Sequence, residues 1–413
     1  MFAKVFTKFR SIYFLIAILL IEVTLLISDS KELRNSKLLV DAGQNILNKE
    51  SPYSTPNPYG PFPGLIFVLI DKLSPFGSSA IIIVLLNLCG YVYMVKFIWP
   101  SMNFSTLIII TIVSFLSSPI RALVSNVQNS GLIIGFALVG IYFYTIYIER
   151  RRIYFLFMSS FCFVFALELK PQLIFPLIIV FVFQQQSYRL LILICAEIIS
   201  IRLMLNLWTG QILELEQYRI WKVMRNDDLA IREQISFWKA LDNIIALRLD
   251  WFGISLLIVL LLTTILAFFS LKYNSRQLIV LALFLPLLSG YLQYYSLLPL
   301  LAVLVHQVLF GTNFIKYGSM FSLIVLVLPT YLGSHLKIYD FLLIMAVNVF
   351  LLFVMNWNSL RFITNIVESF CAFIAVNLVA LSSLELEVGL SYLILLVYLL
   401  QIPNLLDKIK SLV

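Results

Sequence analysis

Long apolar runs separated by short polar segments make up most of this chain. A run of about 20 residues is long enough to cross a bilayer as a helix. The runs fall at 11–28, 78–98, 104–122, 130–148, 153–169, 171–184, 190–208, 251–271, 277–290, 294–311, 316–333, 339–355, 363–381 and 389–404. This pattern predicts an all-α, polytopic membrane helix bundle that forms a single domain over residues 1–413. We expect about 11–14 spans, because several runs are short enough to pair as broken or tilted helices.

Two polar segments are much longer than the others, at 29–77 and 209–250. The first contains a short apolar piece, 61–73, which is too short to cross comfortably and predicts an interfacial or re-entrant helix. In the second, Tyr218, Trp221 and Met224 recur every three residues, as in an amphipathic helix that lies on the membrane surface. We therefore expect two long loops on one side of the membrane.

Composition and charge support this topology. Of the 413 residues, 61% are hydrophobic and only 12% are charged, against about 25% charged in soluble domains. These values exclude a soluble enzyme, a secreted scaffold and a nucleic-acid-binding protein. The net charge of +8 comes from Lys and Arg beside the spans, and such residues mark cytoplasmic loops. The basic positions include Lys4, Lys8, Arg10, Lys96, Arg150, Arg151, Arg152, Arg189, Lys272, Arg276, Lys316, Arg361, Lys408 and Lys410.

The charge pattern predicts a multi-pass protein of the cell (inner or plasma) membrane. Its N-terminus is cytoplasmic, and 29–77 and 209–250 are extracytoplasmic. The four cysteines lie in apolar runs, and we expect them to be small buried side chains without disulfides. The two histidines lie in different segments, so the sequence predicts neither a metal site nor a cofactor.

Asp41 is the first ionisable residue of interest at the predicted outer boundary. Helical spacing places Leu39, Ala42 and Ile46 on one face, and Asp41 on another face with Lys37, Gln44, Asn45 and Asn48. The carboxylate is thereby displayed among hydrogen-bonding groups. The alternative is a solvated loop carboxylate that pairs with Lys37.

Four further polar clusters fall on the same predicted side. Their candidate substrate-binding residues are Tyr53, Tyr59, Arg121, Asn126, Gln128, Asn129, Lys170, Gln172, Gln293 and Tyr294. Arg121 and Lys170 are suited to gripping a phosphate, and the tyrosines to stacking on a sugar. The alternatives are an aromatic belt for the tyrosines, and pairing with Glu168 or snorkelling to the interface for Lys170.

Three ionisable residues lie within predicted spans: Glu22, Glu197 and Arg202. Charged side chains in such places are paired or belong to a transport pathway. We predict that these three form interhelical pairs.

The order of these motifs resembles the polyprenol-phosphate-mannose-dependent mannosyltransferase family, within the GT-C class of integral-membrane glycosyltransferases. The motifs are Asp41, Pro52-Tyr53, Tyr59-Gly60-Pro61-Phe62-Pro63, Asn126-Val127-Gln128-Asn129, Leu169-Lys170-Pro171-Gln172 and Tyr294-Tyr295-Ser296. The likeness covers roughly residues 1–311. The chain departs from the family at 59–63, where the usual pattern is Tyr-x-Tyr-Pro-Pro, and at Gln293, near which the family often has a histidine.

The resemblance implies a GT-C helical bundle with short interfacial helices in the first outer loop. It implies transfer of a mannose-like hexose from a polyprenyl-phosphate-linked donor to a lipid-linked or glycan acceptor, with Asp41 as the catalytic base. The partners would be these substrates and membrane lipids, with no nucleic acid and no cofactor. Two alternatives remain: a surface polysaccharide polymerase or ligase centred on 209–250, and a lipid-linked sugar flippase or transporter.

Overall fold

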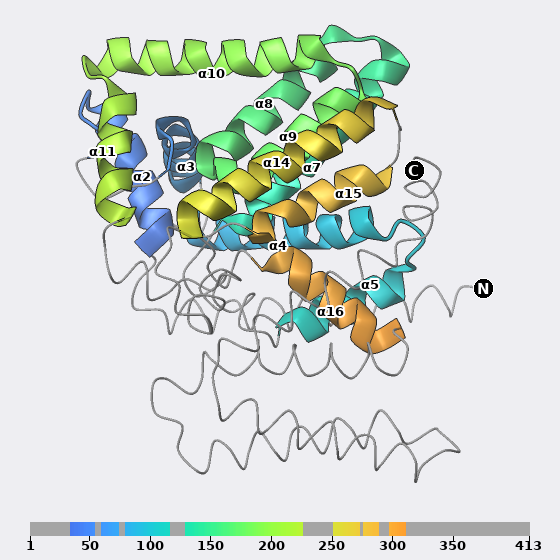
Figure 1. Cartoon of the computed structure of the whole chain (residues 1–413). Coiled ribbons are helices and arrows are strands. Elements are labelled where there is room, and N and C mark those ends of the chain that lie inside the picture. The colour runs from blue at the N-terminus through green and yellow to red at the C-terminus, as the bar shows by residue number, and fades with distance from the viewer. Residues whose placement is uncertain are drawn as a thin grey trace, which may run out of the picture.

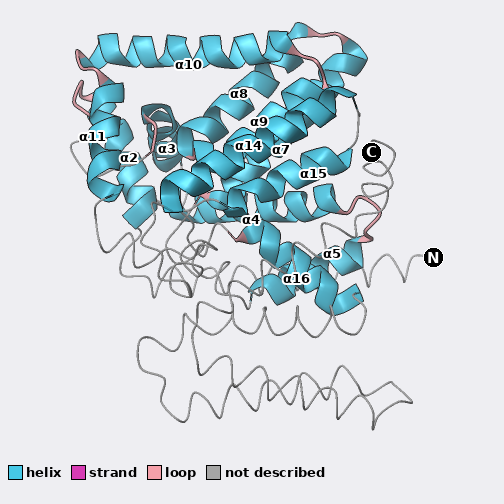
Figure 2. Cartoon of the chain, viewed as in Figure 1, coloured by secondary structure: helices cyan, strands magenta, loops and turns pink. Residues whose placement is uncertain are grey.

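The computed structural model describes residues 34–53, 59–73, 79–115, 129–225, 251–272, 276–288 and 297–310. Within these ranges every regular element is a helix and there is no strand (Figures 1 and 2). The predicted all-α fold is therefore confirmed for this part of the chain. The runs at 11–28 and beyond 311, and the loop segment 226–250, lie outside the described residues.

The helices follow the apolar runs closely. They are α2 (Arg34–Leu47), α3 (Pro61–Leu73), α4 (Ser79–Ile98), α5 (Phe104–Phe115), α7 (Ser130–Arg150), α8 (Ile153–Leu169), α9 (Pro171–Gln184), α10 (Tyr188–Thr209), α11 (Leu213–Arg225), α14 (Trp251–Lys272), α15 (Arg276–Phe284), the 3-10 helix η1 (Leu285–Leu288) and α16 (Leu298–Phe310). Helices α3, α8 and α9 begin and end where the runs 61–73, 153–169 and 171–184 do. A proline at the first position of α3 and of α9 explains two of these starts.

Three of the described helices are long and apolar enough to cross a membrane: Ser130–Arg150, Tyr188–Thr209 and Ile254–Lys272. The apolar stretch of α10 is only 17% buried, against 56% for that of α7. Helix α10 therefore lies at the periphery, and its exposed side chains include Ile192, Leu203 and Leu207. An apolar surface of this kind is suited to contact with lipid.

Glycines allow α4 and α7 to pack backbone against backbone. A Cβ atom on Gly90 of α4 would lie 2.0 Å from the carbonyl oxygen of Gly131, and one on Gly135 would lie 2.7 Å from the Cα atom of Gly90. Asn87 adds a hydrogen bond, because its Oδ1 accepts the backbone N–H of Leu132 at 2.9 Å. Small residues and interhelical amides are the usual means of helix association in membranes.

Helices α7 and α8 run antiparallel, as their contacts show. Ser159 Oγ donates to the Gly140 carbonyl at 2.8 Å, the Phe136 ring lies 4.5 Å from that of Phe165, and the Phe143 ring lies 6.2 Å from that of Phe155. Residue numbers thus rise on α7 as they fall on α8. The first residues of α7 therefore lie level with the last residues of α8.

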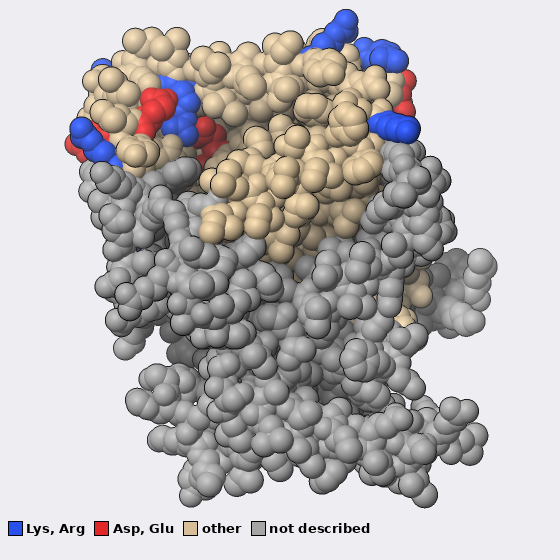
Figure 3. Space-filling model, in the orientation of Figure 1, with Lys and Arg blue, Asp and Glu red and all other residues tan. Residues whose placement is uncertain are grey.

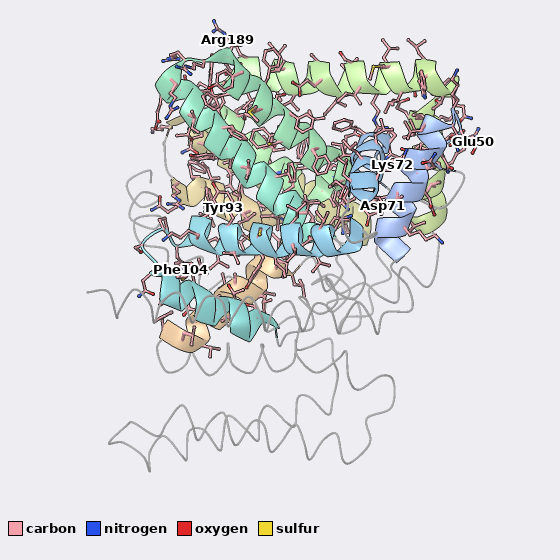
Figure 4. The ribbon with its side chains drawn as sticks, turned by 180° about the vertical axis from the view of Figure 1, so that it is seen from behind. Glu50, Asp71, Lys72, Tyr93, Phe104 and Arg189 are labelled. Carbon is pink, nitrogen blue, oxygen red and sulfur yellow. The ribbon has the colours of Figure 1, made fainter. Side chains whose placement is uncertain are left out.

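Charged side chains gather at two opposite ends of the described helices, with an apolar surface between them (Figure 3). Figure 4 shows Arg189 at one end, and Glu50, Asp71 and Lys72 at the other. We call the first the basic end, where the helices place Lys96, Arg150, Arg151, Arg152, Arg189, Lys272 and Arg276. The opposite end, at the start of α7 and the end of α8, is called the polar end.

The glycine contact predicts a difference between two identical substitutions. Gly90→Ala places a methyl group against the backbone of α7 and should lower the thermal unfolding temperature of the detergent-solubilised protein, at a cost of about 1–3 kcal/mol. Gly140→Ala is the milder comparison, because its Cβ would meet the Phe163 ring at 3.0 Å and no backbone atom at a shorter distance. Equal effects of the two variants would contradict the close packing of α4 and α7.

Candidate functional site at the polar end

A buried ion pair joins α8 to α10 at the polar end. Arg202 of α10 donates from Nε to Glu168 Oε1 and from Nη2 to Glu168 Oε2, both at 2.9 Å. The third donor, Nη1, reaches Gln217 Oε1 of α11 at 3.0 Å. The Glu168 and Arg202 side chains are only 4% and 15% exposed. This bidentate pair is the strong geometry for a guanidinium and a carboxylate.

The prediction that Glu197 and Arg202 form interhelical contacts is confirmed. Glu197 Oε2 accepts a hydrogen bond from Ser160 of α8 at 2.9 Å, and Arg202 also binds α8, through Glu168. Glu168, the partner considered for Lys170, is thus bonded to Arg202. Glu22 lies outside the described residues.

The first long loop is attached to this ion pair. The N–H of Gly60 donates to the carbonyl oxygen of Glu168 at 2.7 Å, and a Cβ atom on Gly60 would lie 1.9 Å from Glu168 Oε2, so only glycine fits. Tyr59 and Tyr53 are buried. The Tyr53 hydroxyl lies near Arg202 and Glu168, and burial raises its pKa. Both rings are therefore enclosed by the bundle.

Helix α2, which carries Asp41, is held beside this loop. A Cβ atom on Gly43 would lie 2.1 Å from the carbonyl oxygen of Gly64 in α3, and Trp208 Nε1 of α10 donates to the Ile46 carbonyl at 2.8 Å. The predicted faces are confirmed: Leu39, Ala42 and Ile46 are buried, and Asp41 is partly exposed on the other side. Asp41 therefore lies on the face of α2 that is turned away from these buried side chains.

Asn129, Ser130 and Lys170 lie at the same level of the bundle, where α7 begins and α8 ends. The antiparallel register places Asn129 and Ser130 level with Lys170, and all three are buried. Within the described ranges, the buried Asn129 side chain has no hydrogen-bond partner at either amide atom. The buried Ser130 hydroxyl has none either. Asn129 precedes α7 but does not cap it through its side chain. The start of α7 thus combines unused donors with the positive end of a helix dipole.

Lys170 is the single residue between α8 and α9. Its backbone lies outside the helical region, with φ −158° and ψ 82°, which is consistent with Pro171, because a residue before proline avoids the helical region. Burial lowers the pKa of Lys170 to about 7. An anion placed beside this amine would favour its charged form. We call Asn129, Ser130, Lys170 and the first turn of α7 the anion cradle.

The structure places only part of the predicted site. Gln172 lies in the first turn of α9 and is partly buried. Arg121, Asn126, Gln128, Gln293 and Tyr294 lie outside the described residues. Asp41 has no described contact with Lys170 or Asn129, although Gly43, Gly64 and Gly60 link α2 to the end of α8.

Sequence reasoning missed two features of the polar end and misjudged one group elsewhere. It did not pair Glu168 with Arg202, and it missed Ser130 in the cradle. The sequence signal for the ion pair is a charged residue inside an apolar run. The signal for Ser130 is its position next to the candidate Asn129. The expectation of buried cysteines is wrong for Cys89 and Cys195, which are exposed, and correct for Cys162. Cys371 lies outside the described residues.

Comparisons with protein-family models, curated proteins and solved structures gave no significant match to this chain. Within the described residues no group of three or more His, Cys, Asp or Glu side chains is placed to hold a metal.

The ion pair predicts a specific pattern of stability. Arg202→Met leaves the Glu168 carboxylate buried without its partner, which costs about 3–5 kcal/mol, and should lower the thermal unfolding temperature in detergent strongly. The double variant Glu168→Leu/Arg202→Leu should recover most of this loss, because both charges are then absent. Arg189→Met is the control, since Arg189 lies exposed at the other end of α10. A small effect of Arg202→Met alone would contradict the pair.

Proposed function

We propose that the chain is an integral-membrane glycosyltransferase of GT-C type, which moves a mannose-like hexose from a polyprenyl-phosphate-linked donor to a lipid-linked or glycan acceptor. The observation that carries the proposal is the anion cradle. A buried amine, an unpaired amide and a helix N-terminus lie there at the same end of an apolar bundle. Such a place suits a phosphate group whose hydrocarbon chain remains in the membrane.

The asymmetry of the two ends supports an orientation. The basic end carries seven Lys and Arg positions of the short loops, which favours the cytoplasmic side. The polar end would then face the extracytoplasmic side, together with the first long loop. Polyprenyl-linked donors carry their own leaving group, so chemistry on that side needs no nucleotide.

The proposed reaction needs one base and one anion site. As the oxygen of the acceptor hydroxyl attacks the anomeric carbon, its proton passes to the Asp41 carboxylate. The bond between that carbon and the phosphate oxygen of the donor breaks, and the electron pair leaves with polyprenyl phosphate. Lys170 and the amide of Asn129 would stabilise the departing charge. A direct displacement of this kind inverts the anomeric centre.

Two contacts weigh against the transporter alternative. Glu197 and Arg202 were its candidates within the described spans, and both are engaged by α8. The polymerase or ligase alternative has one observation in its favour, because α11 of the second long loop binds Arg202 through Gln217. Arg219 of the same helix is exposed. Loss of activity in Arg219→Ala together with retention in Asp41→Asn would favour that alternative.

Removal of the proposed base should abolish transfer. Asp41→Asn in membranes supplied with polyprenyl-phosphate-hexose and acceptor should lower the rate by at least about 10²-fold, within the usual contribution of a general base, with unchanged expression. Glu50→Gln is the control, because this exposed carboxylate follows α2 in the same loop. Full activity in Asp41→Asn would overturn the assignment of the base.

Lys170 should give the reaction a characteristic pH dependence. Because burial lowers its pKa to about 7, the free enzyme loses the Lys170 charge as pH rises through that value. The kcat/KM for the donor should then fall by about tenfold per pH unit above pH 7. Lys170→Arg keeps its charge and should flatten this alkaline limb, whatever its absolute rate. An unchanged alkaline limb in Lys170→Arg would contradict a role in holding phosphate.

A further inference from the structure

A second concave site lies between α10 and α11, on the side of the ion pair away from the bundle core. It is an open pocket of about 540 Å³, within the usual size of small-molecule sites. Ile198, Ile199 and Leu203 of α10 form one wall, and Glu214 and Tyr218 of α11 form part of the other. In Figure 3, acidic and basic side chains gather over this corner.

The two walls are held at a fixed angle by the turn that joins them. Gly210 ends α10 with φ +68°, a left-handed conformation that reverses the chain direction at little cost for glycine. Asn206 then bridges the helices. Its Oδ1 accepts the N–H of Leu213 at 3.0 Å, and its Nδ2 donates to Glu214 Oε2 at 2.8 Å. The shape of the pocket is therefore fixed by the turn at Gly210 and by the hydrogen bonds of Asn206.

The charges of the pocket favour an uncharged ligand over an anion. All three donor nitrogens of Arg202 are used, two by Glu168 and one by Gln217. The charges of Arg202 and Glu168 cancel each other, so the exposed carboxylate of Glu214 leaves the pocket with a net negative charge. A phosphate here would meet like charge without a free guanidinium. Sugar hydroxyls, by contrast, donate well to a carboxylate.

The remaining walls fit the two parts of a glycolipid. Tyr218, 64% exposed, offers a ring face for a sugar. The face of α10 that gives Ile199 and Leu203 to the pocket wall continues with Leu207, and all three side chains are exposed. A hydrocarbon chain that follows this face would remain in the membrane while its head group entered the pocket.

We propose that this pocket binds the uncharged sugar head group of a membrane glycolipid, with its chain along α10. In naming this lipid as the acceptor, the inference rests on the proposed function, whereas the binding itself rests on the pocket. The site is separate from the anion cradle, which lies on the α7 side of the ion pair. Phosphate and hydroxyl-bearing substrate would thus enter from different faces.

The test is photo-crosslinking of the full chain in nanodiscs, without any donor. The probes are a monoglucosyl diacylglycerol and a phosphatidylglycerol that carry the same diazirine in the acyl chain, and labelled peptides are mapped by mass spectrometry. We expect the glucosyl lipid to label residues 198–218 at least about fivefold more than phosphatidylglycerol, which corresponds to about 1 kcal/mol.

Three variants make this selectivity specific to the pocket. Tyr218→Ala should reduce labelling by the glucosyl lipid about fivefold, the equivalent of about 1 kcal/mol. Glu214→Lys should invert the preference toward phosphatidylglycerol. Tyr188→Ala is the control, because Tyr188 is similarly exposed, at 57%, on the other end of α10, and it should have no effect.

Equal labelling by the two lipids, or a preference of the natural chain for phosphatidylglycerol, would overturn the proposal. So would selectivity that survives both Tyr218→Ala and Glu214→Lys. The proposed function is tested separately. If the chain is labelled selectively but transfers no sugar, the glycolipid-binding site is supported and only its role as an acceptor site is refuted.

Discussion

The polar end depends on the Glu168–Arg202 ion pair. A charge within an apolar bundle has to be paired, and here each charge supplies the partner of the other. Two apolar side chains would hold α8 and α10 together equally well, so stability alone does not account for the pair. What the ion pair adds is a fixed orientation of the two helix segments that it joins. A bidentate fork fixes the end of α8 against α10, and with it the backbone that binds Gly60 and the position of Lys170 two residues later.

Away from this pair, the bundle is assembled by backbones that approach closely. Gly90 with Gly131, and Gly43 with Gly64, bring helices to distances that no Cβ atom permits. Where the hydrophobic effect between helices is weak, as in lipid, such contacts provide the van der Waals energy that joins them. The glycines therefore set which helices touch. The polar side chains set what the ends of those helices present.

Helix positions and faces were predictable because local rules determine them. Prolines and charges interrupt the apolar runs, which is why α3, α8 and α9 were located to the residue. The period of 3.6 residues placed Asp41 opposite Leu39 and Ile46. The buried or exposed state of Cys89 and Cys195 was not predictable, since a helix surrounded by protein and lipid is apolar on every side.

The candidate site was predictable in its residue types and only partly in its assembly. Lys170 and Asn129 were singled out from the sequence, but their position at the same level follows from the antiparallel packing of α7 on α8. The Glu168–Arg202 contact joins residues 34 positions apart, and no short-range pattern encodes it. The angle between α10 and α11 likewise depends on one left-handed residue, Gly210.

The same ion pair divides the polar end into two electrostatic environments. On the α7 side, a buried amine and helix N–H groups favour negative charge. On the α11 side, Glu214 remains after Arg202 and Glu168 neutralise each other. For the proposed transfer, the first environment suits the leaving group, which gains charge, and the second suits a substrate whose hydroxyl groups donate hydrogen bonds. In the proposed arrangement, exchange of the two ligands would place phosphate beside the Glu214 carboxylate, which the like charges disfavour.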